Sequence, residues 1–288
     1  MADRVHANPL QEPAWVRNGL IALAALLMGL LVVLPLLMIL FAAFGKGFGE
    51  WIAALREPDA IAALQLTLFT AAIVIPVNGV FGLLTAWAVT RFEFFGKRVL
   101  LALIDLPFAV SPVVAGLCLV LLFGAQGWFA EILREHEIRI LFARPGIVLA
   151  TLFITFPFVV RELIPLMQQQ GSEEEIAARS LGANAWTMFF RVTLPNIKWG
   201  LLYGVLLCGA RAMGEFGAVS VVSGHIRGLT NTLPLHIEIL YNEFNSTAAF
   251  AVASLLAGMA LVTLVLKFWL EARHGDALAQ PQGRRRDA

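Results

Sequence analysis

The sequence is poor in charge. Only 14% of its 288 residues are Asp, Glu, Lys or Arg, compared with about 25% in an average soluble domain, and 59% are hydrophobic. A soluble chain of this size cannot bury so much apolar surface, so lipid must act as the solvent for most of it. Basic and acidic residues nearly cancel, leaving a formal net charge of +1 that gives no sign of a nucleic-acid partner.

Residues that carry chemistry are also scarce. Cys118 and Cys208 are too few and too far apart for a disulfide framework or a metal site, and the five histidines show no ligand spacing. The sequence contains no GxxxxGK[ST] phosphate loop, no Ser-centred nucleophile elbow and no HExxH pattern. We therefore predict a chain that is not an enzyme by itself and holds no metal.

Long apolar segments account for most of the chain. A spanning helix needs about 20 mainly apolar residues, and six segments meet that requirement: 19–44, 61–90, 99–124, 145–168, 197–222 and 246–270. The first is too long for a signal peptide and is interpreted as a retained span. The sequence thus predicts an all-α membrane protein with one six-helix domain over 19–270. An N-terminal segment, 1–18, precedes it, and a tail that we expect to be disordered, 271–288, follows.

The distribution of Lys and Arg predicts the orientation of these spans. With the N-terminus inside, fourteen of the 21 basic residues fall in inner segments, six fall in outer segments, and Arg211 lies within a span. The bias predicts that both termini are cytoplasmic. It also places the longest polar loop, 169–196, on the cytoplasmic side.

That polar loop contains a well-marked helix. Ser172 and Glu175 have capping-box spacing, and three glutamates, 173–175, suit the positive end of the helix dipole. Gly182 can end the helix in a left-handed conformation, and Asn184 can cap a second helix, 185–192, which we expect Pro195 to stop. Two interpretations follow, with about equal weight on physical grounds: a hairpin that joins two spans, or a docking helix for a cytosolic partner.

Two spans carry charged residues at depth. Arg211 and Glu215 share a helix face at i, i+4 spacing and can neutralise one another beside a row of small residues, Ala210, Gly214 and Ala218. They are either a structural ion pair or part of a pathway or gate.

In the third span, Asp105 precedes prolines at 107 and 112, which predicts a kink or a cavity lining. Arg161 and Glu162, in the fourth span, are expected to reach the inner interface. The outer loop, 125–144, reads as an amphipathic surface helix.

The polar loop resembles the EAA loop of ABC importer permeases, whose pattern is Glu-Ala-Ala, three residues, Gly, nine residues, Ile, one residue, Leu-Pro. Here Ile176 occupies the glutamate position and Glu175 stands one place earlier, while Val192 replaces the isoleucine. The resemblance implies that loop 171–195 carries a coupling helix that enters a cleft of an ATPase subunit. The coupling residues it implies are Glu174, Glu175, Ala177, Ala178, Leu181, Gly182, Leu194 and Pro195.

Three further motifs, 105–116, 211–226 and 230–235, resemble sulfate permeases, and more closely the W-type than the T-type subunit. The resemblance implies a type I ABC importer permease of the bacterial inner membrane that moves sulfate or thiosulfate by alternating access. The pathway or gate residues proposed from these motifs are Asp105, Ser111, Arg211, Glu215 and Ser220.

The same resemblance implies the partners. They are a homologous permease, two ATP-binding subunits that hold the ATP and Mg, a periplasmic sulfate-binding protein and membrane lipid. A molybdate or tungstate permease is the alternative, followed by an ion-coupled secondary transporter.

Overall fold

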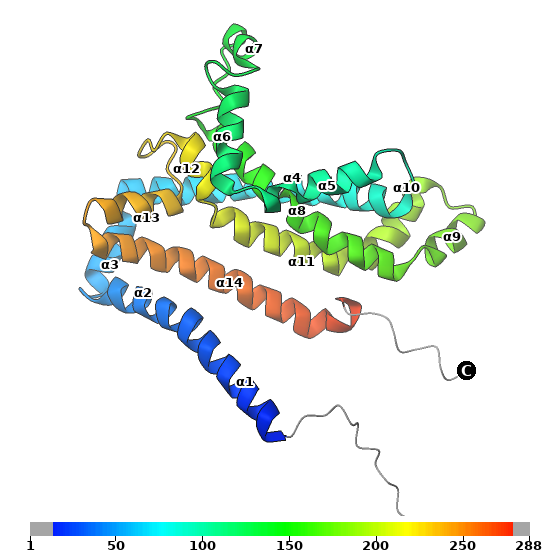
Figure 1. Ribbon diagram of the computed structural model, residues 1–288, viewed down its shortest axis with the longest axis horizontal. Coiled ribbons are helices and arrows are strands. Elements are labelled where there is room, and N and C mark those ends of the chain that lie inside the picture. Colours follow the sequence, from blue (N-terminus) through cyan, green and yellow to red (C-terminus); the bar gives the residue numbers. More distant parts are fainter. Residues whose placement is uncertain (1–13, 279–288) are drawn as a thin grey trace, which may run out of the picture.

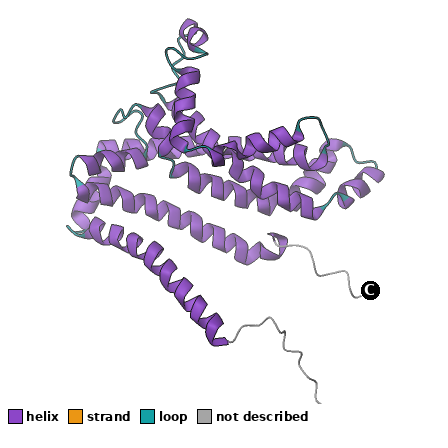
Figure 2. Ribbon diagram, in the orientation of Figure 1, coloured by secondary structure: helices purple, strands orange, loops and turns teal. Residues whose placement is uncertain are grey.

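The computed structural model describes residues 14–278, and all regular structure in that range is helical (Figure 2). Four long helices run side by side along an elongated bundle (Figure 1). They are α4 (Pro58–Arg91), α8 (Arg144–Gln170), α11 (Leu194–Met213) and α14 (Ser246–Leu278). The second, fourth and sixth predicted spans are confirmed as the long apolar helices α4, α8 and α14.

The tightest packing in the bundle joins α4, α8 and α11. Glycines let the backbones approach: Gly82 of α4 lies against Val159 of α8, and Gly200 of α11 lies against Leu166 of α8. Buried Asn78 adds a polar contact, because its Nδ2 donates to Thr155 Oγ1 at 2.8 Å. These helices therefore form the rigid centre of the chain.

The first predicted span is helical but almost uncovered. It comprises α1 (Ala14–Met28), a π-helical turn η1 (Gly29–Val33) and α2 (Leu34–Phe44). None of its most apolar window is buried within the chain. α2 packs against α14, whereas α1 diverges from the bundle in Figure 1.

The third and fifth predicted spans are not single helices. The third divides into α5 (Lys97–Ala109) and α6 (Pro112–Phe123), and the chain bends by 113° between them. The fifth divides into α11 and α12 (Gly217–Ser223), which meet at 51°. Pro112 explains the first break, because the residue before a proline is driven out of the helical region, and Ser111 is extended there. By length and composition, residues 14–278 contain four to six candidate spans, depending on how the bent pairs are counted.

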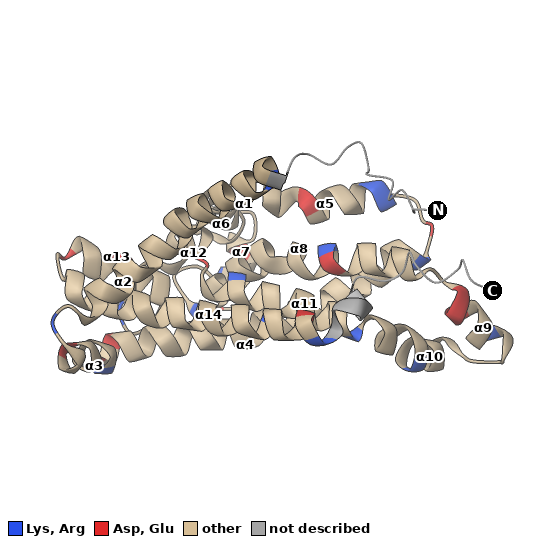
Figure 3. Ribbon diagram, turned by 90° about the horizontal axis from the view of Figure 1, so that it is seen from below, with Lys and Arg blue, Asp and Glu red and all other residues tan. Residues whose placement is uncertain are grey.

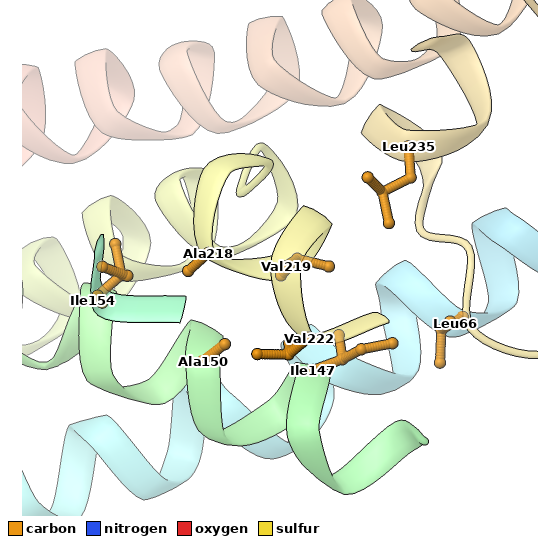
Figure 4. Close-up of a cluster of buried hydrophobic side chains, with 9 residues drawn as sticks. Leu66, Ile147, Ala150, Ile154, Ala218, Val219, Val222 and Leu235 are labelled. Atoms are coloured by element: carbon orange, nitrogen blue, oxygen red, sulfur yellow. The ribbon is translucent and has the colours of Figure 1, made fainter. Parts of the chain in front are cut away.

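The two broken helices contact each other at their breaks. A Cβ on Gly217 would lie 2.8 Å from Pro112 Cβ, and one on Gly116 would lie 2.8 Å from the carbonyl oxygen of Ala218. A buried apolar cluster surrounds this contact (Figure 4), with members Leu66, Ala115, Ile147, Ala150, Ile154, Ala218, Val219, Val222 and Leu235. Because the two breaks are packed against each other, a movement at one break displaces residues at the other.

Several shorter helices complete the fold. α3 (Phe48–Arg56) and α13 (Leu233–Asn242) were not predicted, and both lie at one end of the bundle (Figure 1). α7 (Ala130–Glu135) lies at the tip of α6 and is much shorter than the surface helix expected in 125–144. Residues 1–13 and 279–288, which belong to the expected terminal segments, lie outside the described residues.

The packing of α4 on α8 predicts a sharp difference between two glycines of α4. Gly82→Ala should destabilise the protein by about 1–3 kcal/mol, because its Cβ would lie 2.7 Å from Val159 Cβ, an atom that cannot rotate away. Thermal unfolding in detergent measures the loss. Gly79→Ala is the matched control: its Cβ meets Val205 Cγ2 at 3.4 Å, an ordinary contact. Equal melting temperatures for the two variants would contradict this packing.

Candidate functional site

The helix predicted in the polar loop is present as α9 (Glu173–Ser180), followed by α10 (Ala185–Met188), at the end of the bundle opposite α3 and α13 (Figure 1). Gly182 follows α9 with φ +87°, which confirms the left-handed turn expected there. Asn184 caps α10 as predicted, since its Oδ1 accepts the Thr187 amide at 2.7 Å. The loop therefore has a defined conformation.

The capping box predicted for Ser172 and Glu175 does not form. Ser172 makes no side-chain cap, and Glu175 is buried with its carboxylate turned into the fold. There it lies 2.8 Å from Arg91 Nε and accepts a hydrogen bond from Thr193 Oγ1 at 2.7 Å. A guanidinium and a hydroxyl in a partly buried site are stronger partners for a carboxylate than one amide at the surface.

This ion pair ties four parts of the chain together. Arg91 ends α4, and its Nη1 also donates to the carbonyl of Met167 near the end of α8 at 3.2 Å. Thr193 immediately precedes α11. Glu174 accepts a hydrogen bond from Asn196 Nδ2 in the first turn of α11. α9 is therefore attached to α4, α8 and α11.

The segment from α9 to α10 exposes three large apolar side chains. The exposed fractions are 61% for Ile176, 89% for Leu181 and 73% for Trp186. Ala177 is also exposed, whereas Ala178 is half-buried. Large exposed apolar side chains at a charged helix suit a protein contact.

Pro195 does not stop the helix that begins at α10, as we had expected. α10 continues through a π-helical turn, η2 (Phe189–Thr193), directly into α11, and Pro195 lies in the first turn of α11. The Leu194 amide reaches back five residues to the Phe189 carbonyl. This wider turn accommodates the missing proline amide without ending the helix. Leu194 is half-buried and Pro195 exposed.

A second ion pair lies at the α11–α12 break. Arg211 Nη2 is 2.8 Å from Glu215 Oε2, which confirms the pairing expected from their spacing. The other carboxylate oxygen of Glu215 accepts the Ala218 amide at 3.0 Å and so caps α12. The expected row of small residues does not share one face, because Ala210 and Gly214 line an apolar hollow against α2 and α14 while Ala218 packs on α6.

A third ion pair joins α5 to α8 and was not predicted. Arg161 Nε donates to Asp105 Oδ1 at 2.9 Å, and Arg161 Nη2 lies 2.8 Å from the same oxygen. The partner lies 56 residues away in sequence, but the sequence offered a signal: opposite charges at similar depth in consecutive spans.

The remaining predicted pathway residues stand near these pairs in sequence. Ser111 is exposed at the α5–α6 break and makes no side-chain cap. Ser220 is partly buried in α12, and its hydroxyl donates to the Gly217 carbonyl at 2.9 Å. The structure thus pairs Asp105 with Arg161 and Arg211 with Glu215, but shows no contact between the two pairs.

Charged residues also gather at the end of the bundle that carries α13. Arg227 pairs with Asp59 and Glu243, and its hydrogen bond to Glu243 raises the Arg227 pKa further. His236 of α13 is buried, and burial lowers its pKa. Within residues 14–278, no group of three or more His, Cys, Asp or Glu is arranged to hold a metal ion.

Comparisons with known proteins place this geometry in a family. The family model described as "Binding-protein-dependent transport system inner membrane component" matches residues 78–275. The sulfate transport system permease protein CysW of Escherichia coli K12 is 51% identical over 270 residues, which cover 94% of this chain and 92% of that protein. Sulfate permease 2 of Chlamydomonas reinhardtii chloroplasts is 52% identical over 264 residues, 91% of this chain and 72% of the relative.

A more distant relative is the sulfate transport system permease protein CysT of Escherichia coli K12. It is 38% identical over 246 residues, 85% of this chain and 89% of that protein. A chain of a bacterial alginate ABC transporter shares the fold, with a TM-score of 0.74 at 15% identity over 93% of this chain and 96% of that chain.

The buried position of Glu175 predicts that its loss releases α9. Glu175→Gln should weaken the attachment by about 2–4 kcal/mol, because Arg91 is left with a charge that is 13% exposed and unpaired. We expect amide hydrogen exchange in 173–180 to accelerate by about 10²-fold, while exchange in the centre of α8 is unchanged.

The control is Glu93→Gln, which removes the same charge from a surface pair with Lys97, where the Glu93 side chain is 90% exposed. It should leave exchange in α9 unaltered. Equal protection of α9 in the wild type and in Glu175→Gln would mean that Glu175 does not anchor it.

Proposed function

The chain belongs to the family of binding-protein-dependent transport system inner membrane components, and from this premise we propose that it is the W-type permease subunit of an ATP-driven importer of sulfate or thiosulfate. The similarity to CysW over nearly the whole chain carries the proposal. Identity to CysW is 51%, compared with 38% to CysT, which favours the W-type subunit. A molybdate or tungstate permease remains the alternative substrate assignment, since those anions share the tetrahedral shape and double charge.

We propose that the chain crosses the membrane six times, with α5–α6 and α11–α12 each counted as one broken span. Both termini and α9 then lie in the cytoplasm, as the Lys and Arg distribution favours. The charged cluster around Arg227 lies on the opposite, periplasmic side, where a binding protein delivers the anion.

α9 is proposed as the coupling helix that docks into an ATPase subunit. The exposed apolar residues of α9, the turn after it and α10 (Ile176, Leu181 and Trp186) supply the contact, and Ala177 allows close approach. Glu175 takes a different part from the one first assigned to it: its carboxylate holds α9 on the bundle through Arg91. Glu174 supports the same attachment through Asn196.

The attachment gives ATP-driven movement a route into the membrane. α9 is held to the ends of α4 and α8 and to the residue that precedes α11. α11 runs without interruption from the polar loop to the break at Glu215. A displacement of α9 is therefore transmitted along rigid helices to the joint where α12 meets α6, and we propose that this joint opens and closes in alternating access.

The apolar surface that this chain leaves exposed indicates its partners. The first span is exposed over its apolar window, which fits packing against a second, homologous permease. Two ATPase subunits, one for each permease, supply ATP and Mg, and a periplasmic binding protein supplies the anion. No residue of this chain is assigned to hydrolysis.

The test is reconstitution of the complete complex in proteoliposomes. Uptake of radiolabelled sulfate should require ATP and the binding protein. Leu181→Asp should abolish uptake and reduce ATPase copurification at least tenfold, because it places a charge on the 89%-exposed apolar residue that directly follows α9. Molybdate in excess should not compete with sulfate.

Leu229→Asp is the matched control, since Leu229 is 57% exposed and lies between α12 and α13, outside α9 and α10. It should leave ATPase copurification intact. Sulfate uptake without ATP would contradict an ABC importer and favour a secondary transporter. Molybdate uptake with no sulfate uptake would contradict the substrate assignment.

A further inference from the structure

The Asp105–Arg161 pair lies within two candidate spans, away from the ends of their helices. Arg161 stands nine residues before the end of α8 at Gln170, about 14 Å along the helix axis. Asp105 stands eight residues after the start of α5 at Lys97, about 12 Å along that helix. Figure 3 shows charged residues along α5 and α8 as well as at the ends of the bundle. A charged pair at this depth calls for a functional explanation.

The rest of the described chain leaves this pair uncovered. The side chains of Arg161 and Asp105 are 54% and 53% exposed. Lipid cannot cover them at low cost, because charges in hydrocarbon face protein or water. The pair therefore faces a water-filled passage or another protein chain.

The guanidinium of Arg161 is held in a fixed plane with one edge free. Asp105 Oδ1 occupies the edge formed by Nε and Nη2. The Phe108 ring lies 4.4 Å from the guanidinium carbon and is itself packed edge-on against Phe158 at 5.3 Å. The edge formed by Nη1 and Nη2 has no partner among the described residues. Two parallel N–H groups on such an edge match two oxygens of a tetrahedral oxyanion.

The other two arginines that form ion pairs in the bundle are more enclosed. Arg91 is 13% exposed, and it contacts both Glu175 and the Met167 carbonyl. Arg211 is 35% exposed, and its partner Glu215 also caps α12. Arg161 is the most exposed of the three, and its partner Asp105 makes no second contact that would fix a helix end.

We propose that Arg161 is an anion-binding residue of the translocation pathway, and that its free Nη1–Nη2 edge receives two oxygens of a divalent tetrahedral oxyanion during transport. This assignment rests on the proposed function. Asp105 is a positioning residue: it orients the guanidinium and cancels part of its charge. Partial neutralisation keeps the anion weakly bound, which a pathway requires if it is to release what it admits.

The test uses the complete complex in proteoliposomes, with sulfate uptake, complex assembly and ATP hydrolysis measured together. Arg161→Gln should lower the maximal uptake rate at least tenfold while assembly and binding-protein-stimulated ATP hydrolysis stay within twofold of wild type. Arg161→Lys keeps the charge but loses the paired donors, so uptake should fall about threefold. Lys97→Gln is the control, because it removes an equal charge from a surface pair on the same α5 helix, and uptake should stay within twofold.

A double variant separates anion binding from simple pairing. Asp105→Asn with Arg161→Gln removes both charges, so it leaves no carboxylate unpaired and should assemble even if Arg161→Gln alone does not. If Arg161 binds the anion, the double variant transports as poorly as Arg161→Gln. Recovery of uptake in the double variant would overturn the assignment and leave only a structural pair.

The failures of the two proposals differ. Normal sulfate uptake by the wild type and by Arg161→Gln alike would overturn the role of Arg161 and leave the importer intact. Absence of sulfate uptake by the wild-type complex would overturn both.

Discussion

Charged side chains in so apolar a chain must be paired, and this constraint determines where the joints between its helices lie. Three of the ion pairs lie where helices of the bundle meet. Arg91 and Glu175 attach α9 to the ends of the long helices. Arg211 and Glu215 lie at the α11–α12 break, and Asp105 and Arg161 join α5 to α8. Because an unpaired charge in this setting is costly, each pair fixes the geometry of its joint.

Two of these ion pairs hold helices together, and the third leaves part of a guanidinium exposed. Glu175 and Glu215 are both buried. The second carboxylate oxygen of Glu175 accepts a hydrogen bond from Thr193 Oγ1, and that of Glu215 accepts one from the Ala218 amide. Those carboxylates act as clamps at the two ends of α11. Asp105 is exposed and engages only one oxygen, so its pair leaves a cation edge open. The clamps fit transmission of movement, whereas the open pair fits contact with an anion.

Local sequence signals predicted the local features well. The long apolar helices α4, α8 and α14, the turn at Gly182, the Asn184 cap and the Arg211–Glu215 pair all depend on residues close in sequence, and these are confirmed. The capping contact predicted for the Glu175 side chain was wrong, because Arg91, which is distant in sequence, is a stronger partner for the carboxylate than the local backbone amide. The Asp105–Arg161 pair and the convergence of the two breaks depend on tertiary packing in the same way. The rule that proline ends a helix failed at Pro195, because a π-helical turn continues the helix into α11 there.

The central claim is that movement of α9 reaches the pathway through the Arg91–Glu175 clamp. The most direct measurement is the amount of sulfate imported per ATP hydrolysed in proteoliposomes that carry Arg91→Gln. The account predicts that the ATPase still docks on the outward face of α9 and hydrolyses ATP, but that the sulfate imported per ATP falls about tenfold or more. A ratio equal to that of the wild type, with hydrolysis retained, would contradict it.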